Sequence, residues 1–167
     1  MTGDLELVPR QVLPSGVIVR PRWPRRVVLI ERDTFARVEL AQTMLPATIR
    51  LILTRAYEPE TRLQKGLRQL GAFIFACIFP SRRSEVTEIF GHNGHADDGT
   101  HVDVGVEEQG RRINLLPMGV MTPTAVQNWR SHKHRAVLAA VRSSLEAVGF
   151  RIHPNPTEAM QIHCDVE

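Results

Sequence analysis

The chain has 167 residues, the length of a single domain with a substantial core. Its 43% hydrophobic and 5% aromatic content predicts a core built from Leu, Val and Ile rather than from aromatic rings. The formal net charge of +3 is too small to indicate nucleic-acid binding by itself, and two cysteines are too few for a disulfide framework.

The start of the chain lacks the features of a secretory signal. Residues 1–16 contain charged side chains and have no apolar segment of the kind that a signal peptide needs. The apolar run 72–79 is much shorter than the roughly 20 residues that a membrane span requires. We therefore expect a cytoplasmic protein without a membrane span, although a protein from which a leader had been removed would look the same.

The first 26 residues are rich in proline and arginine, and they predict an irregular basic arm with a short strand at 17–19. Residues 20–26 of this arm read Arg-Pro-Arg-Trp-Pro-Arg-Arg. Such a block of like charge is typical of a solvated surface segment, and it is also the part of the chain suited to contact a polyanion. The remaining residues, 27–167, are predicted to form the folded domain.

The first elements of this domain are marked by capping and breaking residues. The apolar stretch 27–30 indicates a short buried strand or the approach to a helix. Asp33–Thr34 suits the N-cap of a helix over 34–45, which Pro46 ends. The β-branched stretch 48–57 then predicts a strand.

A second helix is predicted from Pro59 to about residue 79, because proline is favoured in the first turn of a helix. Cys77 lies in its apolar run and is predicted to be a small core residue. The other cysteine, Cys164, follows His163 on the last predicted strand, and strand alternation points it to the opposite face.

The second half of the chain continues to mix helices and strands. The predicted elements are a short helix at 84–90, a strand at 102–106, a strand at 112–115 that pairs with it through a turn at Gln109–Gly110, a long helix over 124–148 that ends at Gly149, and a last strand at 160–166. Because there is no βαβ regularity, the predicted fold class is α+β, a small single domain with a mainly antiparallel sheet flanked by helices.

Two clusters of His and Asp carry the chemical signal. Three histidines and three aspartates lie within 91–104, and the last strand repeats the combination. Neutral imidazole and carboxylate are good zinc ligands, and a catalytic zinc takes about three protein ligands and leaves one position for water. The ligand candidates are His95, Asp103 and His163. His101 shares a strand face with Asp103 and is an alternative ligand, whereas a loop rich in Gly, Asn and Asp is also typical of a surface turn.

The order of the motifs resembles the zinc D-alanyl-D-alanine dipeptidases and carboxypeptidases. That family has a strand ending in Tyr-Arg-Pro, a helix, a Ser-x-His-x-x-Gly-x-Ala-x-Asp motif, a Met-Gly-Thr-Pro-like loop, a helix ending in Gly-Phe, and a Glu-x-x-His strand. The corresponding segments here, within roughly 34–166, are 57–59, 95–104, 118–123, 134–150 and 161–163. The resemblance implies a small α+β domain whose antiparallel sheet carries a zinc site.

The implied activity is hydrolysis of a short peptide, of the D-Ala-D-Ala cell-wall type, by a metal-activated water. In this mechanism the three ligand candidates hold Zn²⁺, and Tyr57 borders the substrate cleft. Glu158 is the nearest carboxylate before His163 and is the candidate base that accepts the proton. Arg55 is the candidate that stabilises the oxyanion.

The departures from the family pattern concern the base and the oxyanion partner. Met160 stands where the family has its catalytic Glu, and Glu58 stands where it has the Arg after Tyr. On regular strands Glu158 would point away from the metal and Arg55 would face the wrong side, so each role requires a local irregularity. The loop motif also has one additional residue between its His and its Asp.

Two alternatives stay open from the sequence. The base could instead be Asp97 or Asp98 in the loop, or Asp165, which shares a strand face with His163. The rival function, from another class, is a non-catalytic binding module on a peptidase-like scaffold, whose basic arm contacts a polyanion in a salt-dependent way.

Overall fold

The computed structural model describes residues 4–23, 25–59, 62–86, 90, 99–114, 119–152 and 162–166. The described strands are β1 (Leu5–Pro9), β2 (Gln11–Val12), β3 (Ile18–Val19), β4 (Val27–Glu31), β5 (Ile49–Arg55), β6 (His101–Glu108), β7 (Arg111–Arg112), β8 (Phe150–Ile152) and β9 (Ile162–Val166). The described helices are α1 (Arg32–Thr43), α2 (Arg62–Ile78), α4 (Thr124–Lys133) and α5 (Arg135–Ala147), with short 3₁₀ helices η1 (Pro80–Glu85) and η2 (Gly119–Met121).

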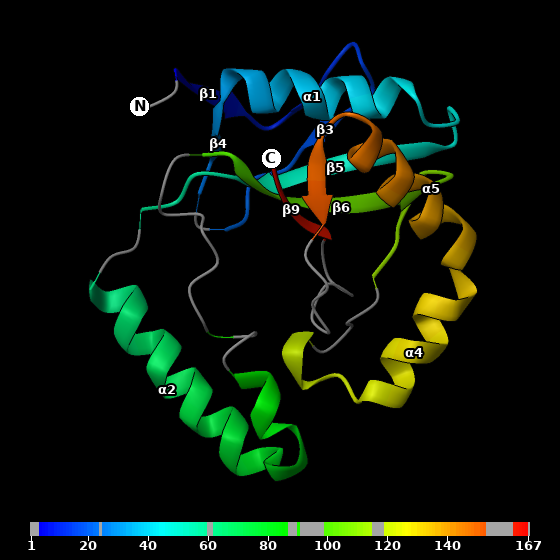
Figure 1. The fold of residues 1–167 in the computed structure, drawn as a ribbon. Helices are drawn as coiled ribbons and strands as arrows, with labels where there is room; N and C mark the ends of the chain where they lie inside the picture. Colours follow the sequence, from blue (N-terminus) through cyan, green and yellow to red (C-terminus); the bar gives the residue numbers. More distant parts are fainter. Residues whose placement is uncertain are drawn as a thin grey trace.

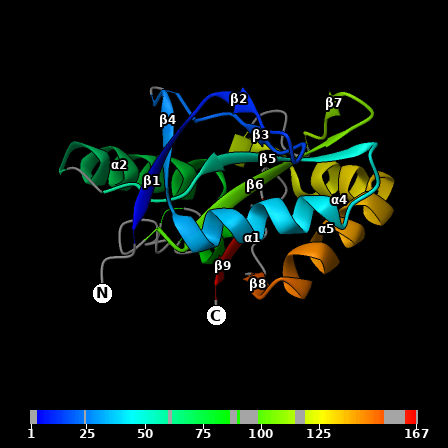
Figure 2. The ribbon, with the colours of Figure 1, turned by 90° about the horizontal axis from the view of Figure 1, so that it is seen from above.

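These elements form an α+β domain with a mainly antiparallel sheet, as predicted. The main sheet has the order β2-β3-β5-β6-β9-β8, with β7 paired to the end of β6, and a small second sheet pairs β1 with β4. The β3–β5 pairing is parallel and the other pairings are antiparallel. Figures 1 and 2 show α1 along one face of the main sheet with α5 beside it, and Figure 1 shows α2 and α4 on the opposite side.

The N-terminal segment belongs to the fold, which corrects the prediction of an irregular arm over 1–26. Strand β1 pairs with β4, and β3, found where a short strand was predicted, pairs with β5. Val8, Val17 and Val19 are at most 2% exposed. The sequence prediction was wrong because two prolines, a glycine and an arginine separate Val8 from Val17, and the Val17–Val19 alternation is too short to show that the whole segment is buried.

The hydrophobic core lies between one face of the main sheet and the helices α1 and α5. Its members include Val102 and Val104 from β6, Ile162 and Cys164 from β9, Phe35 and Val38 from α1, and Val141 and Leu145 from α5. Full burial of one such Val or Leu side chain stabilises the fold by roughly 1.5–3 kcal/mol. Cys164 is 0% exposed in this core, which confirms that it faces away from His163.

The long predicted helices are present, with one change at an N-terminus and one interruption. Helix α1 begins at Arg32 because the carboxylate of Glu31 accepts hydrogen bonds from the backbone N and the Oγ1 of Thr34, both at 2.7 Å, so Glu31 rather than Asp33 is the N-cap. The helix predicted over 124–148 is interrupted at His134, where the backbone leaves helical geometry. Gly149, with φ of +88°, ends α5 as predicted.

The second half of the sheet follows the prediction with shifted boundaries. Strand β7 pairs with β6 through a turn at Gln109–Gly110, where φ is +50° and +75°. Two positive φ values are the geometry of a tight type I′ hairpin turn. The predicted short helix over 84–90 overlaps η1, and its residues 87–89 lie outside the described part of the chain. Strand β8, which follows directly on α5, was not predicted.

Helix α2 packs through one side only. Phe75 is fully buried, and its ring lies 5.1 Å from that of Phe79 and 5.8 Å from that of Phe90, measured between centroids. Cys77 is exposed, so its prediction as a core residue is wrong: a helix that packs on one side buries only part of an apolar run. Within the described ranges, no helix is long and apolar enough to cross a membrane.

Candidate functional site

Four polar side chains share the sheet face opposite the core, where β6 pairs with β9. The register places His163 directly across from Asp103, and Asp165 across from His101. Because side chains alternate along strands, all four occupy one face, as predicted from the spacing of His101 and Asp103. The rings of His101 and His163 stack, with centroids 5.7 Å apart and planes 14° from parallel.

Asp103 and His163 form the most specific contact in this group. Asp103 Oδ1 lies 3.1 Å from His163 Nδ1, and the two side chains are 12% and 15% exposed. Two ligands on one tetrahedral zinc, with bonds of about 2.0–2.2 Å, place their donor atoms roughly 3.3 Å apart. The 3.1 Å contact is a hydrogen-bond distance, and it is also close to the spacing of two zinc ligands. A carboxylate beside an imidazole is also the arrangement that orients metal-binding histidines.

Most of the remaining predicted metal ligands and bases cannot be placed. His95, Glu158, Asp97 and Asp98 lie outside the described residues. Within the described part of the chain, no three His, Cys, Asp or Glu side chains form a group that could hold a metal ion. What the structure brings together is a pair of predicted ligands, with the alternative ligand His101 stacked beside it.

A bulge in β5 brings Arg55 to this pair. Leu53 pairs with Val104, but Arg55 pairs with Asp103, so Thr54 is an extra residue in the strand. Without the bulge, Arg55 would stand opposite Val102, on the core face. Thr54 Oγ1 donates a 3.0 Å hydrogen bond to the backbone oxygen of Asp103, which helps to hold the irregular register.

Arg55 then connects two carboxylates. Its Nη1 lies 3.9 Å from Asp103 Oδ2, and its Nε pairs with the carboxylate of Glu58. The side chains of Arg55 and Glu58 are only 14% and 20% exposed. The irregularity that the sequence required for Arg55 to lie beside the ligand candidates is thus present in β5.

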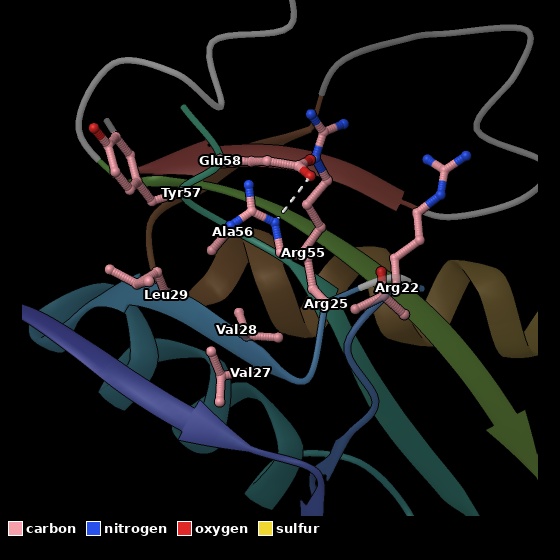
Figure 3. A pocket seen from close by; sticks show the side chains of 10 residues that line it. Arg22, Arg25, Val27, Val28, Leu29, Arg55, Ala56, Tyr57 and Glu58 are labelled. Carbon is pink, nitrogen blue, oxygen red and sulfur yellow. Dashed lines mark ion pairs between the residues drawn. The ribbon is translucent and has the colours of Figure 1, made fainter. Parts of the chain in front are cut away.

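A hollow adjoins Arg55 at the ends of β4 and β5 (Figure 3). Its lining residues are Arg22, Arg25, Val27, Val28, Leu29, Thr54, Arg55, Ala56, Tyr57 and Glu58. Tyr57, the predicted cleft residue, is held at this place because its backbone N donates to the backbone oxygen of Leu29 at 2.7 Å. Glu58 Oε1 lies 3.5 Å from Arg25 Nε, so this carboxylate lies between two guanidinium groups.

Gly99 positions the start of β6 and with it His101 and Asp103. Its φ is +86°, and its carbonyl accepts a 3.4 Å hydrogen bond from the backbone N of Glu31. A Cβ at this position would lie 2.7 Å from Leu5 Cδ2 and 3.2 Å from the Glu31 nitrogen. Only glycine combines this backbone conformation with so close an approach.

The carboxyl group of Glu31, next to this contact, has a lowered pKa. Burial raises its pKa, but the hydrogen bonds from Thr34, a backbone hydrogen bond from Asp33 and the charge of Arg37 together outweigh burial and lower the pKa below its ordinary value. The carboxylate is therefore ionised at neutral pH, as its capping role requires.

Sequence reasoning missed the part that Arg22 and Arg25 play. The run 20–26 was expected to be a solvated arm, yet the backbone N of Arg22 donates to the backbone oxygen of Thr54 at 3.1 Å. That contact fixes the segment along β5 beside the polar site. The basic composition was visible, but no local pattern shows which distant strand a Pro-rich segment will follow.

Comparisons with protein-family models, with curated proteins and with solved structures give no match to this chain. The resemblance to the zinc peptidases thus stays a prediction from the order of motifs.

Proposed function

We propose that this chain is a zinc-dependent peptidase that hydrolyses a short peptide of the D-Ala-D-Ala type. The observation that carries the proposal is the 3.1 Å approach of Asp103 Oδ1 and His163 Nδ1 across two paired strands. These are the residues that the order of motifs nominates as two of three ligands. A carboxylate and an imidazole at this spacing, on the polar face of a sheet, fit the donor set that zinc takes in hydrolases.

Asp103 and His163 would hold the ion together with His95, and His101 is the alternative third ligand. Bound zinc supplies a Lewis acid and lowers the pKa of a coordinated water to about 7. The protein must then orient the ligands, accept a proton and meet the negative charge that develops on the carbonyl oxygen.

Arg55 suits the last of these tasks. The bulge at Thr54 places its guanidinium beside Asp103, and the pairing with Glu58 restrains it there. A restrained cation costs little reorganisation when negative charge develops nearby, which is the basis of oxyanion stabilisation.

Glu158 is the proposed base, with Asp97 and Asp98 as alternatives from the loop. Asp165 is the weaker candidate, because its Oδ2 lies 3.0 Å from Arg151 Nη2. A carboxylate in an ion pair is a poorer proton acceptor than one without it, since the cation stabilises the charged form.

The test begins with the metal content of protein purified without chelator or histidine tag, measured by elemental mass spectrometry. We expect about one zinc per chain, the stoichiometry of a single three-ligand site. His163→Ala and Asp103→Ala should lose the metal. His132→Ala, which alters an exposed histidine on α4, is the matched control and should keep it. Full occupancy in His163→Ala would refute the ligand assignment.

The second part of the test is turnover. The zinc-loaded chain should release D-alanine from D-Ala-D-Ala, lose this activity on chelation and regain it when zinc is restored. A zinc-containing chain that leaves a panel of short D- and L-peptides intact would contradict the proposed reaction while leaving the metal site in place.

A further inference from the structure

We infer that the hollow at the ends of β4 and β5 is a carboxylate-binding subsite built from Arg22, Arg25 and Arg55, in which Glu58 occupies the place of a ligand carboxylate (Figure 3). The subsite follows from contacts in the described structure. Its assignment to the terminal carboxylate of a peptide rests on the proposed function.

The hollow carries more positive than negative charge. Three guanidinium groups line the hollow: Glu58 pairs with Arg55 and Arg25, and Arg55 also approaches Asp103, so Arg22 is the cation that these carboxylates do not neutralise. No carboxylate within the described ranges forms an ion pair with Arg22. Guanidinium groups bind carboxylates through planar, charge-assisted hydrogen bonds, so a cluster with surplus donors favours a further carboxylate.

The backbone that carries Arg22 and Arg25 is fixed before a ligand arrives. The backbone N of Arg22 donates to Thr54, and the backbone N of Arg25 donates to the backbone oxygen of Arg22 at 2.9 Å. Behind them, Val28 and Ala56 are 3% and 1% exposed. Binding there requires little ordering of the backbone, so the entropic cost is confined to the arginine side chains.

The subsite adjoins the Asp103–His163 pair. Arg55 belongs to both, since it pairs with Glu58 in the hollow and approaches Asp103 on the polar face. A carboxylate held by Arg22 and Arg25 would therefore lie beside Arg55, which separates it from the candidate ligands. This arrangement suits a short peptide whose free terminal carboxylate is bound while its last peptide bond faces the metal.

Glu58 then acts as an internal competitor. A ligand carboxylate must share or displace its contacts with Arg25 and Arg55. Removal of its negative charge should strengthen carboxylate binding, whereas removal of an arginine should weaken it. A Glu58 that merely supports the fold would not produce this opposite pair of effects.

The experiment uses the full chain freed of metal by a chelator, so that neither zinc binding nor turnover affects the result. Acetate and its neutral analogue acetamide are titrated, and the side-chain Nε–H signals of arginine are followed by NMR. We expect saturable shifts of the Arg22, Arg25 and Arg55 signals with acetate and none with acetamide. D-Ala-D-Ala and its terminal amide should show the same preference for the acid.

The variants provide the controls. Arg25→Gln and Arg22→Gln should weaken acetate binding roughly tenfold, the loss of one charge-assisted hydrogen bond. Glu58→Gln should strengthen it severalfold. Arg26→Gln, an exposed neighbour that does not line the hollow, should leave it unchanged. Arg22 is exposed and makes no ion pair in the described structure, so its variant tests the subsite even where another variant fails to fold.

Several outcomes would overturn the inference. Equal shifts with acetate and acetamide, an equal loss of binding in Arg26→Gln, or tighter binding of inorganic phosphate than of acetate would each contradict a carboxylate subsite. Acetate binding in a chain that takes up no zinc would leave the subsite standing and refute the proposed peptidase. Zinc uptake without acetate binding would refute the subsite and leave the proposed peptidase standing.

Discussion

At the scale of single residues, Asp103 shows how a charged side chain is kept inside this sheet. One carboxylate oxygen lies 3.1 Å from His163 and the other 3.9 Å from Arg55. An isolated buried carboxylate costs several kcal/mol, and partners of this kind offset that cost. Asp103 can therefore keep its charge at this largely buried position, and that charge is what the proposed ligand role requires.

Glu31 gives a prediction at the same scale, because its pKa is lowered in the folded state. A lowered pKa means that the carboxylate stabilises the fold above its unfolded pKa, and that this contribution is lost as the pH falls through the folded pKa. Glu31→Gln should therefore lower the free energy of unfolding at pH 7 by roughly 0.5–2 kcal/mol, the range for loss of a helix cap. Urea unfolding at several pH values measures it.

The difference between wild type and Glu31→Gln should shrink as the pH falls below the unfolded pKa of a glutamate and through the lowered folded pKa, where the wild-type carboxyl group becomes neutral. Asp33→Asn is the control, since Asp33 lies in the first turn of α1 but is not its N-cap. A difference that persists unchanged at low pH would show that Glu31 acts through packing rather than through its charge.

At the scale of secondary-structure elements, helix α2 has both buried and exposed apolar residues. Phe75 is fully buried against Phe79 and Phe90, whereas Phe73 is 68% exposed. Phe75→Ala should lower the free energy of unfolding by about 3–5 kcal/mol, because it removes a buried ring and leaves a cavity. Phe73→Ala, the matched change two residues away, should stay within about 0.5 kcal/mol. Chemical denaturation compares them, and equal losses would contradict the packing of α2.

The strand β5 shows what the sequence could and could not predict about an element. Its β-branched composition predicts a strand, and the structure has one at Ile49–Arg55. The bulge at Thr54 has no local signature, since threonine is an ordinary strand residue. It follows from the register with β6, a partner nearly fifty residues away. The face on which Arg55 lies was therefore beyond prediction, although the residue itself could be nominated.

At the scale of the whole molecule, the predictable part of the site is the part with strand periodicity. The spacing of His101 and Asp103 predicts their shared face, and the last strand predicts that His163 faces away from Cys164; both are found. The subsite of Arg22 and Arg25 was not predicted, because it depends on where a Pro-rich segment docks. Long-range docking of irregular segments is decided by the assembled core and not by local propensity.

The same long-range pairing leads to a prediction for the stability of the molecule. Asp103 and His163 are 60 residues apart in sequence and join β6 to β9, so a zinc ion held by both would bind the native chain alone. Binding to the native state stabilises it by about 2.7 kcal/mol when free zinc is a hundred times the Kd. For a domain of this size we expect Tm to rise by roughly 5–10 °C, measured by calorimetry with and without zinc.

Two controls test whether the rise in Tm requires zinc and whether it requires His163. Magnesium should leave Tm unchanged, because it requires oxygen ligands in near-octahedral geometry and imidazole is a poor donor for it. His163→Ala should lose the response to zinc, whereas His132→Ala should keep it, since an exposed histidine on α4 cannot link β6 to β9. An equal rise in wild type and His163→Ala would mean that zinc stabilises the chain elsewhere. No rise in wild type would mean that the polar face, with its paired Asp103 and His163, is a structural ion-pair network, and the carboxylate subsite beside it would then have to be explained without a metal.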